Sequence, residues 1–488
     1  MKIEQRKQAL VVFFLSSLLG FGCVSQLLEV PTDHQQAFLF GVEQSQAGRH
    51  ELSTRAAWQY LKSSDEEDPR FDRTLRLLAR GAEKLGLTYA ASAWYLQIAS
   101  GRRDVALIPE AIEGIRRIVE QGVFDEDALL NRYISVEEFS TMGVELDSFI
   151  HYYQGLHNLR QGEDRWAVRR FKKIHGKSPY RLKARYVMAV RKVALFELEQ
   201  AKSLFEGLAK ELKDERDEQI YTDLWRDSMT SLARLAMQNG DAEQALKYFE
   251  DVRERVPDDP SLLLEIAWAH YQKGSLRRAL GFLLALDAPI YNALIAPERF
   301  ILEAMTYRSL CQFGPARQAA VRLNKRYKQA LEDLYNGVIP NQSKALRLAA
   351  GQRGDLLPIS RFLNQLKYEK ELIRSKKSVF GSEFTSALLK MYSQAQTSAM
   401  ARREHALRKE IKYLTEELLS AEEGVRLITH ELGVALLRGR EPPPDRAPVP
   451  PVGEIANEQQ VIYDFNGEFW TDELDELVIA AEDRCIDQ

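Results

Sequence analysis

Small residues followed four positions later by a bulky apolar residue recur along the first two-thirds of the chain. The clearest pairs are Ala167 and Phe171, Ala201 and Phe205, Ala245 and Phe249, and Ala279 and Leu283. Residues four apart share one face of a helix, where the small side chain lets a second helix approach and the bulky one fills the neighbouring groove. Two intervals between pairs, 167 to 201 and 245 to 279, are 34 residues. The pattern predicts repeated helical hairpins.

Glycine and proline recur in phase with these pairs. Gly240 precedes one pair by a few residues, Pro257 follows it, and Gly274 precedes the next pair. Weaker units of the same kind contain Ala57 and Ala91. An irregular helical bundle is the alternative, but chance spacing does not recur with glycine and proline in phase. We therefore expect about eight units between residues 36 and 335.

This period and this placement of Ala, Gly and Pro resemble the tetratricopeptide repeat (TPR), a helix–turn–helix unit of 34 residues. The resemblance covers about 60% of the chain. It implies an all-α fold in which stacked hairpins form a solenoid with a concave surface for other protein chains. It also implies a protein that binds rather than catalyses.

A different pattern follows the repeats, in residues 336–440. Residues 359–392 carry helical apolar positions, and a heptad then begins near Met400. Its apolar positions are Leu407, Ile411, Leu414, Leu418, Ala421, Val425, Ile428 and Leu432. Four heptads with charged flanks predict a coiled coil. Its partner is left open between the 359–392 helix folding back, which we favour, and a second chain through self-association of residues 400–436.

The N-terminus has the composition of an export signal. A positive start is followed by an apolar stretch from Ala9 to Phe21, shorter than the ~20 residues that span a bilayer as a helix. The stretch ends in Leu-Leu-Gly-Phe-Gly-Cys and resembles a bacterial lipoprotein signal, although Gly20 stands where Leu is usual.

That resemblance implies removal of residues 1–22, lipidation of Cys23 and a linker over residues 23–35. Val24, rather than Asp, after the cysteine implies the periplasmic face of the outer membrane. A plain secretory signal, giving a soluble periplasmic protein, and an uncleaved inner-membrane anchor are the alternatives.

Two further cysteines, Cys311 and Cys485, remain in the exported chain. The periplasm permits disulfides, so a bridge between them would fasten the C-terminal tail to the solenoid. Two separate thiols are the equal alternative.

Residues 165–192 form a block of one charge, with 11 Lys or Arg and no Asp or Glu. A solvated helix face normally mixes charges, so we interpret the block as a basic groove for a partner. Its candidate binding residues are Arg165, Arg169, Arg170, Lys173, Arg181 and Arg185. Anionic envelope surfaces, an acidic partner and the protein's own tail are candidate ligands, and a role in solubility alone is the alternative.

The tail follows a proline-rich linker over residues 441–455 and occupies residues 456–488. Residues 464–488 hold nine acids against one Arg, together with Phe465, Phe469 and Trp470. Disordered segments are poor in aromatic residues, so we expect these three to dock on a partner or on the solenoid. Our hypothesis is that the tail docks on the basic block with Trp470 as its anchor. Otherwise the tail is expected to be mostly irregular.

Motifs for chemistry are absent from the sequence. The eight histidines form no zinc pattern, and no nucleophile elbow or phosphate-binding loop is present. A net charge of −4 and an export signal argue against nucleic-acid binding. We expect no catalytic residues, metal or cofactor.

The whole layout resembles TPR lipoproteins of the envelope of myxobacteria and their relatives, some of which serve gliding motility or other trans-envelope assemblies. The resemblance includes the segment Phe465 to Leu474 and a following cysteine. It implies a non-catalytic scaffold that assembles other envelope proteins. The alternative is an accessory or regulatory subunit of cell-wall synthases or hydrolases.

Overall fold

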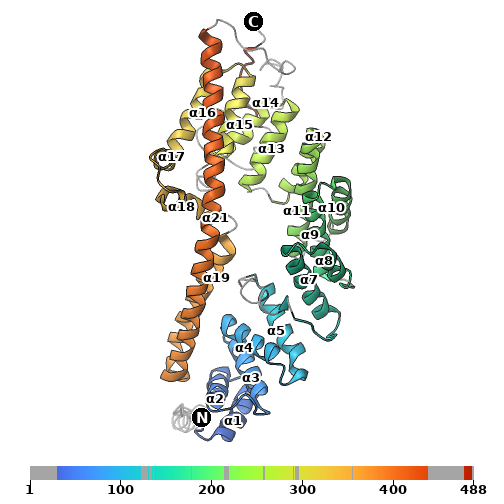
Figure 1. Ribbon diagram of the computed structural model, residues 1–488, viewed down its shortest axis with the longest axis vertical. Helices are drawn as coiled ribbons and strands as arrows, with labels where there is room; N and C mark the ends of the chain where they lie inside the picture. The colour runs from blue at the N-terminus through green and yellow to red at the C-terminus, as the bar shows by residue number, and fades with distance from the viewer. Residues whose placement is uncertain are drawn as a thin grey trace, which may run out of the picture. The chain divides into compact units, whose positions relative to one another are not determined.

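The computed structural model describes residues 30–122, 130, 134–135, 137–176, 178–213, 219–256, 259–288, 291, 296–353, 356–437 and 477–485 (Figure 1). Every regular element within these residues is a helix. The chain divides into two units. Unit 1 comprises residues up to Gly114 together with Tyr368–Tyr392, and unit 2 comprises Ile115–Lys367 and the chain from Ser393 onward.

Unit 1 is built on two helical hairpins, whose helices are α1 (His34–Gln46), α2 (His50–Lys62), α3 (Phe71–Lys84) and α4 (Thr88–Gly101). A short η1 (Val105–Leu107) and most of α5 (Ile108–Glu120) follow. The last part of α19, the short α20 (Lys377–Phe380) and the start of α21 pack on these hairpins. Glu369 of α19 accepts hydrogen bonds from the Thr88 hydroxyl and the Tyr89 amide, so this distant segment belongs to the core of unit 1.

Unit 2 contains five successive hairpins. Their helices are α7 (Val144–Arg160), α8 (Asp164–Phe171), α9 (Pro179–Ala194), α10 (Leu198–Leu212), α11 (Gln219–Gln238), α12 (Ala242–Arg253), α13 (Pro260–Lys273), α14 (Leu276–Ala285), α15 (Glu298–Ser309) and α16 (Phe313–Arg326). Shorter elements follow: α17 (Lys328–Tyr335), η4 (Pro340–Gln342) and α18 (Lys344–Ala350). The long helices α19 (Leu357–Ser375) and α21 (Ser382–Leu437) contribute residues to both units.

The small-and-bulky pairs of the sequence lie on the second helix of each hairpin. Ala245 and Phe249 of α12 are fully buried, as are Ala201 and Phe205 of α10. They share one core with the apolar faces of α9, α11, α13 and α14. The packing that the sequence predicted is therefore the packing that joins neighbouring hairpins.

One turn geometry recurs in all seven hairpins that the structure describes. The residue two positions before the second helix has a positive φ, and the next residue's amide donates to the carbonyl five residues earlier at 2.8–2.9 Å. This is the Schellman ending of a helix, for which glycine is preferred because it lacks a Cβ. Five of these turns carry glycine at that position: Gly48, Gly86, Gly162, Gly240 and Gly274. The other two carry Phe196, with φ 59°, and Cys311, with φ 53°.

The heptad of α21 is buried, but the predicted coiled coil is wrong about its partner. All eight heptad positions from Leu407 to Leu432 lie in one core with residues of α15–α18, including Phe300 and Leu323. The predicted fold-back on α19 involves earlier residues of α21: Arg403 Nε donates to the Ser360 hydroxyl at 3.4 Å, and the Tyr392 hydroxyl donates to Glu369. Because the seam is filled within the chain, residues 400–436 do not offer it for self-association.

Several predicted segments differ in detail or fall outside the description. The second helix expected after Gly381 and the heptad helix are one helix, α21. Residues 1–29, with the predicted signal and Cys23, and residues 438–476, with the proline-rich linker and most of the tail, lie outside the described residues.

A cleft in unit 2 as the candidate partner-binding site

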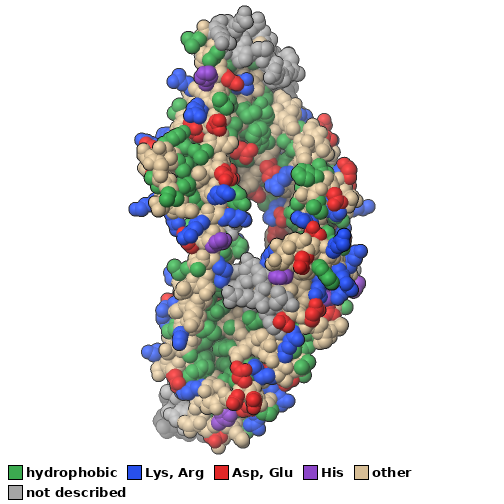
Figure 2. Space-filling model, viewed as in Figure 1, with side chains coloured by type: hydrophobic (Ala, Val, Ile, Leu, Met, Phe, Trp, Pro, Cys, Tyr) green, Lys and Arg blue, Asp and Glu red, His purple; other side chains and the backbone are tan. Residues whose placement is uncertain are grey.

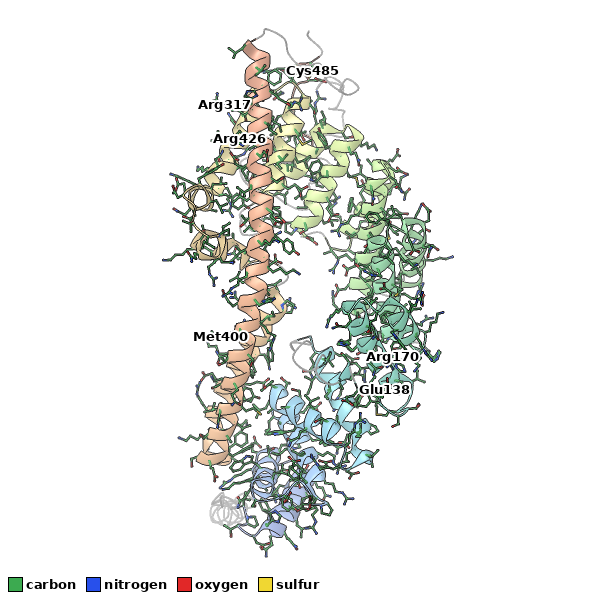
Figure 3. The ribbon with its side chains drawn as sticks, viewed as in Figure 1. Glu138, Arg170, Arg317, Met400, Arg426 and Cys485 are labelled. Carbon is green, nitrogen blue, oxygen red and sulfur yellow. A yellow bond between two sulfur atoms is a disulfide. The ribbon has the colours of Figure 1, made fainter. Side chains whose placement is uncertain are left out.

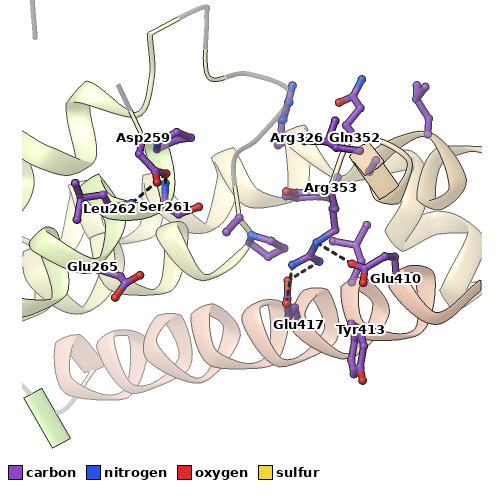
Figure 4. Close-up of a pocket in the computed structure, with 18 of the residues that line it drawn as sticks. Asp259, Ser261, Leu262, Glu265, Arg326, Gln352, Arg353, Glu410, Tyr413 and Glu417 are labelled. Carbon is purple, nitrogen blue, oxygen red and sulfur yellow. Dashed lines mark hydrogen bonds and ion pairs between the residues drawn. The ribbon is translucent and has the colours of Figure 1, made fainter. Parts of the chain in front are cut away.

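A cleft of about 1430 Å³ opens within unit 2 (Figure 4). One wall is formed by α11 and α13, the first helices of two hairpins, with Tyr186 of α9 beside them. The opposite wall is formed by residues of α17, α18 and α19 and by Glu410–Glu417 of α21. The first helices face the cleft because the bulky residues of the second helices are used in packing hairpin against hairpin. The part of the opposite wall that α21 supplies comes from residues that follow the repeats by more than 50 positions.

Charged residues of both signs line the cleft, and most are paired. Arg234 of α11 binds Glu265 of α13 at 2.6 Å. Arg353 bridges two carboxylates of α21, Glu417 at 2.9 Å and Glu410 at 3.4 Å. The first pair joins neighbouring hairpins within one wall, and the Arg353 pairs join the turn after α18 to α21 within the other, so each wall is held by its own ion pairs.

Burial and these pairs shift the pKa of several groups. The hydrogen bond that Arg353 donates to Glu417 raises the pKa of Arg353, and the hydrogen bond that Arg234 donates to Glu265 raises the pKa of Arg234. Burial raises the pKa of the Tyr327 hydroxyl to about 12. Every one of these shifts favours the form already present at neutral pH, so the charge pattern of the cleft is constant near pH 7.

Two arginines of the cleft, Arg326 and Arg361, form no ion pair with any residue in the described parts of the chain. Both are exposed. Exposed apolar side chains stand in the same lining, notably Leu348, with 69% of its surface accessible, and Leu357. Free guanidinium groups beside apolar surface suit a peptide that carries acidic and apolar side chains.

Three residues of the predicted basic groove are paired with acids in the structure. Arg170 binds Glu138, and both are labelled in Figure 3. Arg181 and Arg185 both bind Glu211 of α10. These carboxylates lie outside the basic window of the sequence, and the cleft takes only Tyr186 from that window.

The remaining predicted basic residues lie on or beside α8. The Arg169 guanidinium lies 5.5 Å from the centre of the Trp166 ring. Arg165 is exposed at the start of the helix. Lys173, just after α8, lines a small pocket of about 120 Å³ with Glu138 and His151.

Residues 477–485, the described end of the tail, lie on α14 and on the turn between α15 and α16. Arg277, which is buried, donates from Nε to the Ala481 carbonyl at 2.7 Å, and the Ile479 amide donates to the Arg277 carbonyl at 3.3 Å. The Arg484 amide donates to the Leu310 carbonyl at 3.1 Å. This part of the tail thus docks on the solenoid, but at α14–α16 rather than on residues 165–192.

A disulfide joins Cys311 to Cys485, whose Cα atoms are 5.2 Å apart. It fixes the tail end at the turn where Cys311 replaces the usual glycine. Phe465, Phe469 and Trp470 lie outside the described residues, as does Cys23, so their predicted roles remain predictions.

Other chemistry is sparse within the described residues. They contain no group of three or more His, Cys, Asp or Glu that could hold a metal ion. None of the described helices has the length and apolar composition needed to cross a bilayer. His270 is buried and its ring stacks on Phe282, with ring centres 5.3 Å apart.

Residues 230–293 match the family model of the tetratricopeptide repeat. This segment holds the last nine residues of α11 and all of α12, α13 and α14, so it includes α13 and the C-terminal part of α11 from the first cleft wall. The predicted all-α, TPR-like solenoid is therefore confirmed. Among curated proteins, none matches the sequence of this chain.

Two solved structures align with most of the chain. The crystal structure of the yeast Tom70 is 14% identical, with 84% of this chain and 91% of that chain covered and a TM-score of 0.24. A circular tandem repeat protein with novel repeat topology and enhanced subunit contact surfaces is 12% identical, with 83% and 97% covered and a TM-score of 0.14. Scores this low carry no inference about function.

Proposed function

We propose that this protein is a non-catalytic scaffold that binds segments of other proteins in the cleft of unit 2. The observation that carries the proposal is the cleft itself: TPR helices α11 and α13 form one wall, and α21 supplies the other. Repeat solenoids bind peptides on such surfaces through exposed charged and aromatic side chains.

The expected ligand is a peptide that combines acidic with apolar side chains. Arg326 and Arg361 would bind its carboxylates, while Leu348 and Leu357 would contact its apolar side chains. The ion pairs of Arg234 and Arg353 hold each wall together. Arg326 and Arg361 take no part in these pairs and are available to the ligand.

The cellular setting rests on the sequence. The N-terminal resemblance supports export and lipidation of Cys23, and the disulfide between Cys311 and Cys485 suits an oxidising compartment. We therefore place the scaffold on the periplasmic face of the outer membrane, assembling envelope proteins such as those of trans-envelope or gliding machinery.

A pull-down from crosslinked membranes tests the binding site. The double variant R326E/R361E should lose the partners that the wild type captures, because an acidic ligand would meet two carboxylates in place of two guanidiniums. The matched control is R317E/R426E, which reverses two exposed arginines outside the cleft lining, both labelled in Figure 3. Equal capture by the two variants would contradict the proposal.

The identity of the captured proteins separates the two roles. Structural envelope proteins support the scaffold, whereas cell-wall synthases or hydrolases support an accessory subunit. Labelling with palmitate tests the anchor: label should enter the wild type and not Cys23→Ser, and an unlabelled wild type would refute lipidation.

A further inference from the structure

Phe196 stands out among the turn residues of unit 2. A residue with a side chain in the left-handed region costs about 1–3 kcal/mol where glycine would be relaxed. At Cys311, the other exception, the strain is offset by the disulfide bond that holds the tail. The Phe196 side chain instead is 84% exposed. The fold therefore gains nothing from the phenyl ring, and a ring kept at a strained and exposed position indicates a contact outside the chain.

Other exposed apolar side chains accompany Phe196. Trp166 on α8 is 55% exposed, and Val190 and Leu195 at the end of α9 are exposed as well. The turns of successive hairpins lie along one edge of a solenoid because the first helices run in parallel. A direct bond confirms this proximity: Arg191 of α9 binds Asp164 at the start of α8, at 2.7 Å. We call Trp166, Val190, Leu195 and Phe196 the edge patch.

Positive charge surrounds the edge patch. Arg165, Arg169 and Lys172 follow one face of α8 and its end at helical spacing, and none forms an ion pair within the described residues. The nearby acids are occupied: Asp164 binds Arg191, Glu197 binds Lys192 at 2.6 Å, and Glu163 accepts a bond from Asn158. Figure 2 shows Lys and Arg side chains gathered over the α8 and α9 part of unit 2. Arg165 and Lys172, next to the patch, are therefore free for an anionic surface, while Arg169 lies over the Trp166 ring.

We propose that the edge patch binds the surface of a bilayer that contains anionic phospholipid. Aromatic and aliphatic side chains on a projecting turn can enter the headgroup region, and Lys and Arg around them bind the phosphates. The four side chains of the patch are exposed, Phe196 most of all, which suits contact with a membrane surface. This contact is a second site, separate from the cleft and independent of the proposed peptide binding.

Vesicle sedimentation tests the proposal with the chain from Val24 onward, which retains every described residue and lacks the predicted signal and lipid. The wild type should bind vesicles that contain phosphatidylglycerol and not vesicles of phosphatidylcholine alone. F196G should bind at least about tenfold more weakly, since burial of the phenyl ring supplies apolar contact. R165E/K172E should weaken binding by a similar factor and reduce its dependence on salt.

Two controls keep the result interpretable. F196G should fold at least as well as the wild type, with a thermal midpoint about 2 °C or more higher, because glycine is the relaxed residue at this turn. V321A, which trims an exposed apolar side chain of α16 outside the patch, should bind vesicles as the wild type does. R326E/R361E should do the same, which separates this site from the cleft.

Either of two outcomes would overturn the proposal. One is the absence of wild-type binding to anionic vesicles, including the case in which F196G instead loses a protein partner in the pull-down. The other is equal vesicle binding by F196G and the wild type.

Discussion

His270 shows how burial alone sets the chemistry of a residue. Desolvation lowers the pKa of its imidazole to about 3, and the nearby Arg278 and Lys273 charges act in the same direction. The ring is therefore neutral in the folded protein at pH 7 and packs on Phe282. No ligand is needed to explain a histidine of this kind.

The first prediction concerns stability at mild acidity. The folded pKa lies below the unfolded pKa of about 6.5, so the unfolded chain binds a proton first and stability falls as pH drops from about 6.5 towards 3. Between pH 7 and pH 5 the loss from His270 should reach about 2 kcal/mol. Chemical denaturation of His270→Leu at both pH values should show a smaller loss than the wild type. An identical loss would contradict the assignment.

At the residue scale, the sequence predicted interior positions well and surface pairing poorly. Ala245 and Phe249 are recognisable as core because their spacing reports a helix face. The ion pairs of the basic block could not be predicted, because Glu138 and Glu211, which neutralise part of it, come from outside the window. The unusual place of Phe196 can be recognised in the sequence, because aligning the repeats puts it where Gly162 and Gly240 stand.

At the scale of elements, α21 is held by its heptad face. Leu418 is fully buried among residues of α15–α18, whereas Leu427 on the same helix is 56% exposed. Leu418→Ala should lower the free energy of unfolding by about 3 kcal/mol, because it leaves a cavity in that core. Leu427→Ala should change it by less than about 0.5 kcal/mol.

Sedimentation of the same variants tests the placement of the seam. Wild type and both variants should have the same oligomeric state, because the seam is satisfied within the chain. If the wild type is an oligomer and Leu418→Ala dissociates it, the heptad residues form an interface between two chains instead.

The close approach of the tail to α14 gives a prediction for Gly281. A Cβ on Gly281 of α14 would lie 2.5 Å from the Leu477 carbonyl oxygen. Gly281→Ala should therefore displace the tail, although alanine favours the helix by about 1 kcal/mol. Hydrogen exchange of the Ile479 and Arg484 amides should accelerate at least tenfold, since both donate to the solenoid.

The matched control is Gly314→Ala on α16, because a Cβ there meets nothing within 4 Å. It should leave the exchange of the tail amides unchanged. Equal protection in the two variants would show that the tail does not need the close approach at Gly281.

Elements were predictable as helices but not as neighbours. A heptad indicates that one face of a helix is buried, but it does not indicate what covers that face. The end of a solenoid can cover the face as well as a coiled-coil partner can. The cleft was hidden for the same reason. Arg326 and Arg361 are distant in sequence from Arg234 and Glu265, and only the folded chain brings these residues to one cleft.

At the scale of the whole chain, the bond between Cys311 and Cys485 closes a loop with a sequence separation of 174 residues. Cross-links that close long loops stabilise mainly by restricting the unfolded chain. Cys485→Ser, in the chain from Val24 onward, should lower the free energy of unfolding by about 2–4 kcal/mol.

Reductant provides the comparison for this prediction. It should lower the unfolding midpoint of the wild type to that of Cys485→Ser and leave the variant unchanged. An equal shift in both proteins would mean that the reductant acts elsewhere.

The turn position shared by the hairpins has a practical consequence. A Cβ at Gly240 or Gly274 would touch nothing within 4 Å, so a side chain there would project into solvent and leave the core intact, at a backbone cost of about 1–3 kcal/mol. Within unit 2, Gly162, Gly240 and Gly274 are therefore replaceable positions. The proposed membrane contact of Phe196 could therefore be moved to another turn by exchanging single residues, for instance with Gly274→Phe in an F196G background. The contact would then lie at a different hairpin, and the helices would keep their positions.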